Sequence, residues 1–259
     1  RSNLINNVNR APTMKASAQE IHRSYDELGP IQVMDDGHKR YLAFGTDDEQ
    51  SCQLIHQPHL LQHEYTRAIL LALLMVEPAH ITVIGTGGGS LLTTLHHILP
   101  NCQLQGVELR PEVARLAYKY FQLPKNDHIH IHIGDGFQYL MNNPTRTDLI
   151  IADMYLADGI DQQQLSQQFI EASYTSLNKG GWLVLNYWLD HKLEGMLVET
   201  LQQCFDQIYM CDTGGGNWVI YAGKVDINQV IIQEDKIKPL SKVAGFSLNH
   251  FLRRLVVLT

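Results

Sequence analysis

Several features that would classify a protein quickly are scarce or missing in this chain. It has four cysteines and none stands in a C-x-x-C pair, which predicts reduced thiols in a cytosolic protein rather than a disulfide framework. No apolar run reaches the roughly 18 residues that a transmembrane helix needs. The first residues lack the basic-then-apolar layout of a signal peptide. We therefore expect a cytoplasmic location and no membrane partner.

Positive charge is also in short supply. The 259 residues include 20 Lys and Arg against 27 Asp and Glu, which makes a formal net charge of −7. A general nucleic-acid binder needs a basic surface, so the charge argues against nucleic acid as a partner. Hydrophobic residues make up 44% of the chain. That share is enough for one large domain, alone or with a small appendage.

The most informative segment that is present is 82–90, TVIGTGGGS. An apolar run that stops at a glycine cluster and then becomes helical predicts a strand, a tight turn and a helix. Glycine suits this turn because the backbone adopts positive φ and a ligand must approach it closely. The third glycine of the NAD fingerprint would fall at Ser90, so G-x-G-x-G at Gly85, Gly87 and Gly89 fits better. An ordinary strand-to-helix turn is the alternative.

Acidic residues end the apolar runs that follow. Glu108 ends the run 104–108, roughly 20 positions after the first glycine, where a carboxylate accepts hydrogen bonds from ribose hydroxyls. Asp135 lies within Gly-Asp-Gly, and Asp153 ends the run 148–153. In an open parallel sheet, ligands bind at the carboxyl ends of the strands. The sequence therefore predicts a nucleoside site at these ends.

The alternation of apolar runs and helical patterns predicts an α/β fold. A doubly wound, mostly parallel, seven-stranded sheet of Rossmann-like type is expected, with the last two strands as an antiparallel hairpin at its edge. The expected strands are 81–84, 104–108, 129–133, 148–152, 182–186, 207–211 and 217–222. The expected helices are 59–76, 90–99, 111–121, 136–142, 161–177, 191–204 and 246–258.

The segment before this alternation predicts a smaller unit. Residues 1–28 are polar and are expected to form an irregular tail. An Asp-Gly pair between two apolar runs in 31–44 is a strong hairpin signal, and 51–55 can add a third strand. The predicted division is therefore a tail at 1–28, a β-hairpin unit at 29–57 and a nucleoside-binding catalytic domain at 58–259.

In this order, the motifs resemble the spermidine synthase (polyamine aminopropyltransferase) family, which has the class I S-adenosylmethionine-dependent methyltransferase fold. The likeness runs from about residue 30 to residue 223. It rests on the hairpin, the glycine loop and short motifs at His63-Glu64, Val107-Glu108-Leu109, Gly134-Asp135-Gly136-Phe137, Ile151-Ala152-Asp153 and Leu185-Asn186-Tyr187-Trp188.

The chain departs from the family where amines are held. Gly88 stands where the family's glycine loop has the Asp that holds the donor amine. Gln62 replaces a tyrosine of the acceptor pocket, and Leu156 replaces a second Asp that contacts the acceptor amine. Asn186 stands in place of a Gln. The resemblance implies a well-kept nucleoside site beside an altered amine site, so putrescine should be a poor substrate.

The resemblance implies transfer of an aminopropyl group from decarboxylated S-adenosylmethionine to a polyamine or related small-molecule amine. Asp153 would hold the attacking amine and act as its base, although an Asp there can also cap a helix. Glu108 would bind the ribose and Asp135 the adenine amino group. The remaining nucleoside-binding residues would be Gly85, Gly87, Gly88, Gly89 and Gly136.

The substrate pocket is expected to be lined by Gln62, His63, Glu64, Tyr155, Asn186 and Trp188. Tyr155 and Trp188 would attract a sulfonium by cation–π interaction, or would serve packing alone. His63 and Glu64 would lie at the pocket rim or form a helical surface pair. The family likeness, with the small β unit, also implies a homodimer.

Two other functions stay open. An S-adenosylmethionine-dependent methyltransferase would fit the loss of the donor-amine Asp at Gly88. A catalytically silent nucleoside-binding protein would fit the altered acceptor pocket. A metal is not expected, because His128, His130 and His132 alternate on one strand without a fourth ligand at suitable spacing.

Overall fold

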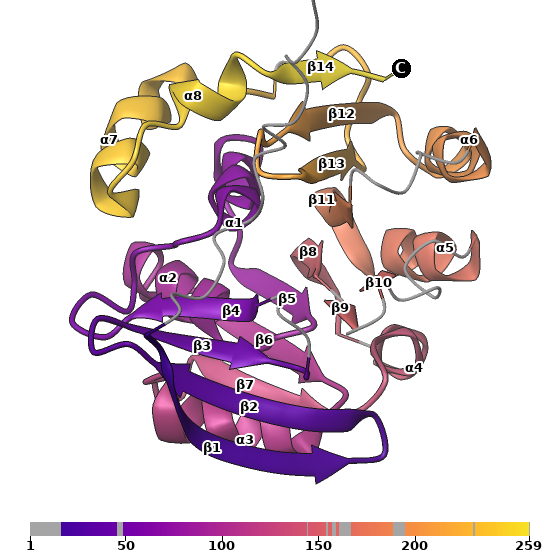
Figure 1. Cartoon of the computed structure of the whole chain (residues 1–259). Helices are drawn as coiled ribbons and strands as arrows, with labels where there is room; N and C mark the ends of the chain where they lie inside the picture. The colour runs from indigo at the N-terminus through magenta and orange to yellow at the C-terminus, as the bar shows by residue number, and fades with distance from the viewer. Residues whose placement is uncertain are drawn as a thin grey trace, which may run out of the picture.

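The computed structural model describes residues 17–45, 49–143, 145–153, 155–156, 159–160, 167–188, 195–229 and 231–258. Its centre is an eight-stranded sheet in the order β14-β12-β13-β11-β8-β5-β6-β7 (Figure 1). In that order, the strands are Leu255–Val257, Gln207–Asp212, Asn217–Gly223, Leu177–Trp188, Thr147–Ala152, His80–Ile84, Gln103–Glu108 and Ile129–Ile133.

The five strands from β11 to β7 run parallel, whereas β13, β12 and β14 are joined by antiparallel pairings. Chain order reverses beside β5, since β6 and β7 follow on one side and β8 and β11 on the other. Such a reversal opens a crevice at the carboxyl ends of the strands. The doubly wound fold is confirmed, with β14 as an eighth strand at the edge where the β12–β13 hairpin was expected.

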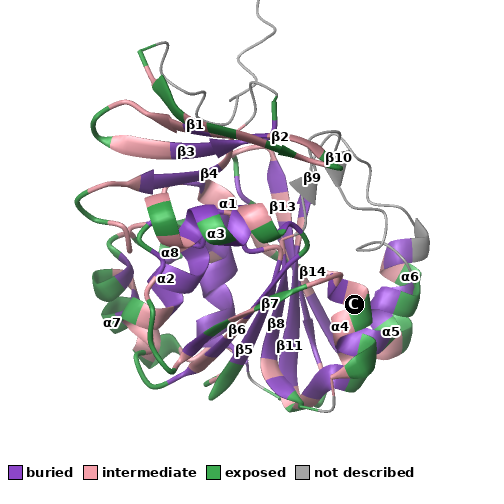
Figure 2. Ribbon diagram, turned by 90° about the horizontal axis from the view of Figure 1, so that it is seen from below, coloured by how far each residue is buried: buried purple, intermediate pink, exposed green. Residues whose placement is uncertain are grey.

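Helices cover both faces of this sheet (Figures 1 and 2). One layer contains α4 (Gly136–Asn142), α5 (Gln167–Ser176) and α6 (Gly195–Cys204). The other contains α1 (Glu64–Ile69), the 3-10 helix η1 (Leu70–Leu74), α2 (Ser90–Ile98), α7 (Glu234–Ala244) and α8 (Asn249–Leu252).

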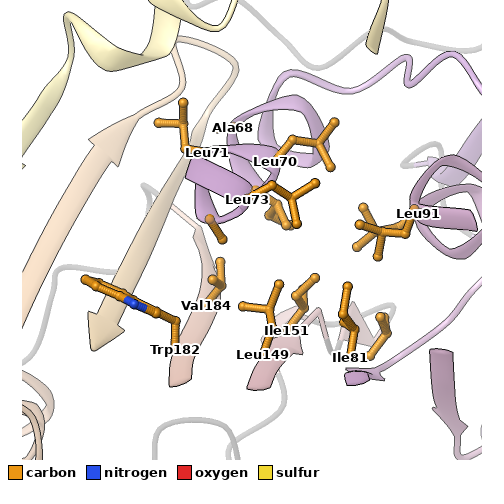
Figure 3. Packing of buried hydrophobic residues seen from close by; sticks show 14 of the residues in the cluster. Ala68, Leu70, Leu71, Leu73, Ile81, Leu91, Leu149, Ile151, Trp182 and Val184 are labelled. Atoms are coloured by element: carbon orange, nitrogen blue, oxygen red, sulfur yellow. The ribbon is translucent and has the colours of Figure 1, made fainter. Parts of the chain in front are cut away.

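The central strands carry continuous apolar runs because both of their faces are buried. In β8, Leu149 and Ile151 face the α1–α2 layer, while Ile150 and Ala152 face the α4–α6 layer. Figure 3 shows Leu73 of η1 pointing toward the strands β8 and β11, which carry Leu149, Ile151 and Val184. This core fixes the strand ends that carry the candidate site.

A second sheet, of the antiparallel strands β1 (Gln19–Asp26), β2 (Gly29–Asp35), β3 (Lys39–Ala43) and β4 (Glu49–Leu54), precedes the large one. Its apolar face, with Ile31, Val33 and Leu42, packs on α3 (Pro111–Tyr120). Strand β1 shows that the expectation of an irregular tail through residue 28 is wrong for 19–26, since β2 gives that polar segment a backbone partner. Residues 1–16 lie outside the described residues.

Two helix expectations are wrong. The segment expected as one helix at 59–76 contains a β-bridge from Leu61 to Gln53, an extended His63, and only then α1 and η1. Apolar spacing alone does not register this backbone pairing. In the C-terminal tail, the helix expected at 246–258 is the short α8 followed by β14, and α7 precedes it at Glu234–Ala244. The start of the helix expected at 161–177 lies outside the described residues.

Candidate active site

The glycine loop leaves β5 and enters α2 at the centre of the crevice. Gly85, Gly87 and Gly89 all adopt positive φ, of 81°, 52° and 80°. A Cβ at Gly87 would lie 2.7 Å from the Ser51 hydroxyl, and one at Gly89 would lie 2.9 Å from Leu123. The G-x-G-x-G spacing therefore serves both the turn and the close packing around it.

Glu108, at the end of β6, accepts hydrogen bonds from this loop. Its Oε2 accepts hydrogen bonds from the backbone N–H groups of Thr86 and Gly87 at 3.1 and 3.2 Å, and from the Thr86 hydroxyl at 3.2 Å. Its Oε1 accepts from the backbone N–H of Arg110 at 3.0 Å. Burial raises the pKa of Glu108, and these hydrogen bonds oppose that rise. A carboxylate has about four lone-pair sites, so Oε1 can still accept from a ribose hydroxyl.

Gly88 is covered by residues that the sequence did not point to. Its N–H donates to the Ser51 hydroxyl at 2.9 Å, so β4 lies against the loop. A Cβ at Gly88 would meet the Phe121 ring and the Ser51 Cβ at 3.1 Å. Such contacts are tighter than ordinary packing, so this position resists an added side chain.

Asp153 follows β8 directly, and its backbone N–H donates to the Ile84 carbonyl at 2.8 Å. This bond places it beside the start of the glycine loop. Its Oδ1 accepts a hydrogen bond from the Asn186 amide at 2.8 Å, and the Asn186 oxygen accepts from Asn217 at 2.9 Å. The structure thus brings together Asp153 and Asn186, and adds Asn217 of β13.

Two further groups, His63 and Tyr65, act on the Asp153 carboxylate. Burial raises its pKa, while the Asn186 bond, the charge of His63 and a hydrogen bond with Tyr65 act in the opposite direction. His63 is buried, with Nε2 2.6 Å from the Glu49 carboxylate, and its ring stacks on Tyr65 with centroids 5.4 Å apart. The sequence indicated His63, whereas Tyr65 and Glu49 were missed.

The other expected site residues make local contacts. Asp135 caps α4, since its Oδ1 accepts from the backbone N–H of Gln138 at 2.8 Å, and Gly136 begins that helix. Gln62 donates to the Leu60 carbonyl, and Glu64 pairs with Arg67 at 2.9 Å. Their ligand roles stay predictions. The side chains of Tyr155 and Trp188 lie outside the described residues.

The three histidines near β7 do not converge on one point. His128 contacts Gln103, His130 contacts the Asp127 carbonyl, and the ring of His132 lies 5.0 Å from that of Tyr139. Within the residues that the structure describes, no three His, Cys, Asp or Glu side chains are grouped to hold a metal ion. Over the same residues, no helix is long and apolar enough to cross a membrane.

Comparison with known proteins identifies the family. The spermine/spermidine synthase domain model matches residues 61–214, more than half of the chain. The chain belongs to the spermine/spermidine synthase family. That match contains the glycine loop, Glu108, Asp135 and Asp153, so the resemblance inferred from the motifs is confirmed.

Similarity to individual proteins is consistent with this family assignment. The chain is 29% identical over 179 residues to the polyamine aminopropyltransferase of Neisseria meningitidis serogroup A. The aligned region covers 68% of each protein. The spermidine synthase structure from Thermotoga maritima matches with a TM-score of 0.68 at 16% identity, over 92% of this chain and 84% of that one. Human methyltransferase-like protein 13 matches with a TM-score of 0.55 at 23% identity, over 73% and 89%. The two structures confirm the methyltransferase-type fold.

Proposed function

We propose that this protein transfers an aminopropyl group from decarboxylated S-adenosylmethionine to a polyamine or related amine. One observation carries the proposal. In a chain of this family, Asp153 lies at the end of β8, and its backbone N–H donates to Ile84 of β5, the strand that leads into the glycine loop. A nucleoside in the crevice would place its sulfonium arm beside that carboxylate.

The nucleoside would be held by the loop and by Glu108. Positive φ favours glycine at positions 87 and 89, and because glycine has no side chain, the adenosyl group can approach the backbone there. The Glu108 carboxylate is fixed by backbone N–H groups on both sides, and its orientation is therefore set before ligand binds. Preorganised acceptors bind with less loss of side-chain entropy.

The transfer itself needs an uncharged amine. The lone pair of its nitrogen would attack the methylene carbon next to the sulfonium, forming a C–N bond. The C–S bond breaks and its electron pair returns to sulfur, which leaves methylthioadenosine. The proton that the amine nitrogen gives up passes to Asp153 acting as general base. Burial raises the pKa of Asp153, which makes it a stronger base than an exposed carboxylate.

The side-chain amides of Asn186 and Asn217 would orient that base. Asn217 donates to Asn186, and Asn186 donates to Asp153, so a chain from β13 and β11 holds one carboxylate oxygen. A carboxylate has about four lone-pair sites, so Asp153 can accept from the amine while Asn186 and Tyr65 hold it. The acceptor is predicted only as a small amine, because Leu156 and Gln62 replace the groups that grip a diamine in the family.

Calorimetry with methylthioadenosine tests the nucleoside site. The wild-type chain should bind it, and Glu108→Gln should weaken the binding about ten- to a hundredfold, as expected for loss of charge-assisted hydrogen bonds worth about 1.5–3 kcal/mol. Gln keeps one acceptor for the Thr86 and Gly87 N–H groups, so the loop stays supported. Asp206→Asn, an exposed carboxylate, is the control. Unchanged affinity in Glu108→Gln would remove the proposed site. Tighter binding of S-adenosylhomocysteine than of methylthioadenosine would favour methyl transfer instead.

A further inference from the structure

Glu49 has a buried carboxylate oxygen that pairs with no group among the residues that the structure describes. Its side chain is 2% exposed, and Oε1 lies 2.6 Å from His63 Nε2. Oε2 is buried and accepts no hydrogen bond from that described part of the chain. A buried charged oxygen is costly unless it is paired. Such an atom in a candidate active site points to a donor that arrives with the ligand.

The position of Glu49 links the two halves of the site. Glu49 begins β4 two residues before Ser51, and the β3–β4 pairing shifts register between them, since Ser51 pairs with Leu42 and Glu49 with Ala43. Ser51 accepts the Gly88 N–H of the glycine loop. His63, the partner of Glu49, exerts its charge on Asp153. Glu49 is therefore connected to the loop through Ser51 of the same strand and to the proposed base through His63.

A charge is missing at the same place. The aminopropyl arm of the proposed donor ends in an ammonium group, which needs an anionic partner when it is buried. Gly88, whose N–H donates to Ser51, carries no charge, and a side chain there would require Phe121 or Ser51 to shift by a few tenths of an ångström. Glu49 is a carboxylate on β4, the strand whose Ser51 contacts Gly88.

We propose that Glu49 binds the terminal ammonium of the donor's aminopropyl arm, with Oε2 as the acceptor and His63 holding Oε1. This inference rests on the proposed function and adds a specificity residue to it. It predicts that the site prefers adenosyl thioethers that carry a primary amine over those that end in a methyl group.

The test compares two thioethers by calorimetry. One is methylthioadenosine, and the other is the donor without its sulfonium methyl, which keeps the aminopropyl arm. The wild-type chain should bind the amine-bearing thioether about tenfold or more tightly than methylthioadenosine. In Glu49→Gln, which keeps an acceptor for His63, this preference should fall by about tenfold while methylthioadenosine binds as before.

Matched controls separate the ammonium role from a structural one. Glu112→Gln removes another carboxylate that pairs with a histidine, since Glu112 lies 3.2 Å from His22. Both oxygens of Glu112 also accept hydrogen bonds from Arg115. This substitution should leave the preference unchanged. Glu49→Asp keeps the charge and should retain part of it. A thioether ending in a hydroxyl should bind the wild-type chain no better than methylthioadenosine, a comparison that needs no folded variant.

Four results would overturn the inference. These are an unchanged preference in Glu49→Gln, an equal loss for both thioethers in a folded Glu49→Gln, no preference in the wild-type chain, and a hydroxyl analogue that binds as tightly as the amine-bearing thioether. If the wild-type chain binds neither thioether, the proposed function falls with it. If it binds both equally well, the nucleoside site stands and only the role of Glu49 falls.

Discussion

Asp153 differs from an ordinary surface carboxylate in its surroundings. It is half-buried, one oxygen is held by Asn186, and His63 and Tyr65 lie near it. Burial disfavours the charged form, and the neighbours restore part of its stability. A carboxylate in this balance can accept a proton from an ammonium during reaction and release it to water afterwards.

Replacing Asp153 by Asn should separate chemistry from binding. The variant should bind methylthioadenosine normally. It should transfer the donor's aminopropyl group at least about a hundredfold more slowly, because a general base contributes about 10²–10⁴ in rate. Asn keeps the size of Asp, so the fold should survive. Single-turnover release of methylthioadenosine measures the rate, and calorimetry measures the binding.

The pH profile gives the sign of the same effect. Because burial raises the pKa of Asp153 above its ordinary value of 3.8, the wild-type rate should fall on the acid side at a pH above that value. The carboxylate that protonates there can no longer accept the amine proton. The Asn variant should lack this limb. An Asn variant with near-normal turnover would remove Asp153 from the mechanism.

The positions of candidate site residues were predictable where a motif carries them, while their ligand roles stay predictions. The glycine loop, Glu108, Asp153 and His63 lie where a strand ends or a helix begins, and Asn186 lies two residues before the end of β11. Glu49, Tyr65 and Ser51 were not, because their roles arise from the packing of β4 and α1 on the loop. The sequence of a strand in the small sheet does not indicate which distant loop that strand contacts.

At the scale of elements, one arginine connects the small sheet to the candidate site. Arg110 follows Glu108, and its side chain is 3% exposed. It donates two hydrogen bonds to Asp26 of β1 at 2.8 and 2.6 Å, a third to the Gly29 carbonyl, and stacks over Phe44 at 4.5 Å. The edge of the antiparallel sheet is thereby attached to the end of β6.

Weakening this connection should destabilise the protein. Asp26→Asn leaves the buried Arg110 guanidinium without its counter-charge, so the free energy of unfolding should fall by about 1.5–3 kcal/mol, the usual range for hydrogen bonds to charged groups. Denaturant unfolding at neutral pH measures this, with Asp206→Asn as an exposed control that should change little. A loss no larger than that of the control would contradict the assigned role.

The acid dependence follows from the same pair. The Arg110 hydrogen bond lowers the pKa of Asp26 below its ordinary value of 3.8. The ionised pair therefore stabilises the folded state above that pH, and the contribution is lost as pH falls through the lower pKa of the folded state. The wild-type chain should lose more stability on acidification than Asp26→Asn does.

The elements that were misjudged share a physical cause. Residues 19–26 form a strand only because β2 pairs with them, and 59–63 stay extended because Leu61 bridges to Gln53. Helix α7 contains Pro239 and charged residues, which hid its acidic first turn and its left-handed Gly245 cap. Tertiary pairing and capping decided these segments, and hydrophobic spacing did not register them.

For the whole molecule, the alternating pattern was sufficient. Strands buried on both faces carry unbroken apolar runs, and their order with the intervening helices leaves few topologies for a parallel sheet. The short β14 was missed because its partner β12 is far from it in sequence. The domain division and the homodimer stay predictions, the latter open to measurement of mass in solution.

The reaction products test the central claim most directly. The wild-type chain is incubated with decarboxylated S-adenosylmethionine and a panel of amines that includes putrescine, with Asp153→Asn as the inactive control. The account predicts methylthioadenosine and an amine that has gained one aminopropyl group, in equal amounts by mass spectrometry, with putrescine among the slower acceptors. S-adenosylhomocysteine and a methylated product formed from S-adenosylmethionine, with no aminopropyl transfer to any amine, would contradict it.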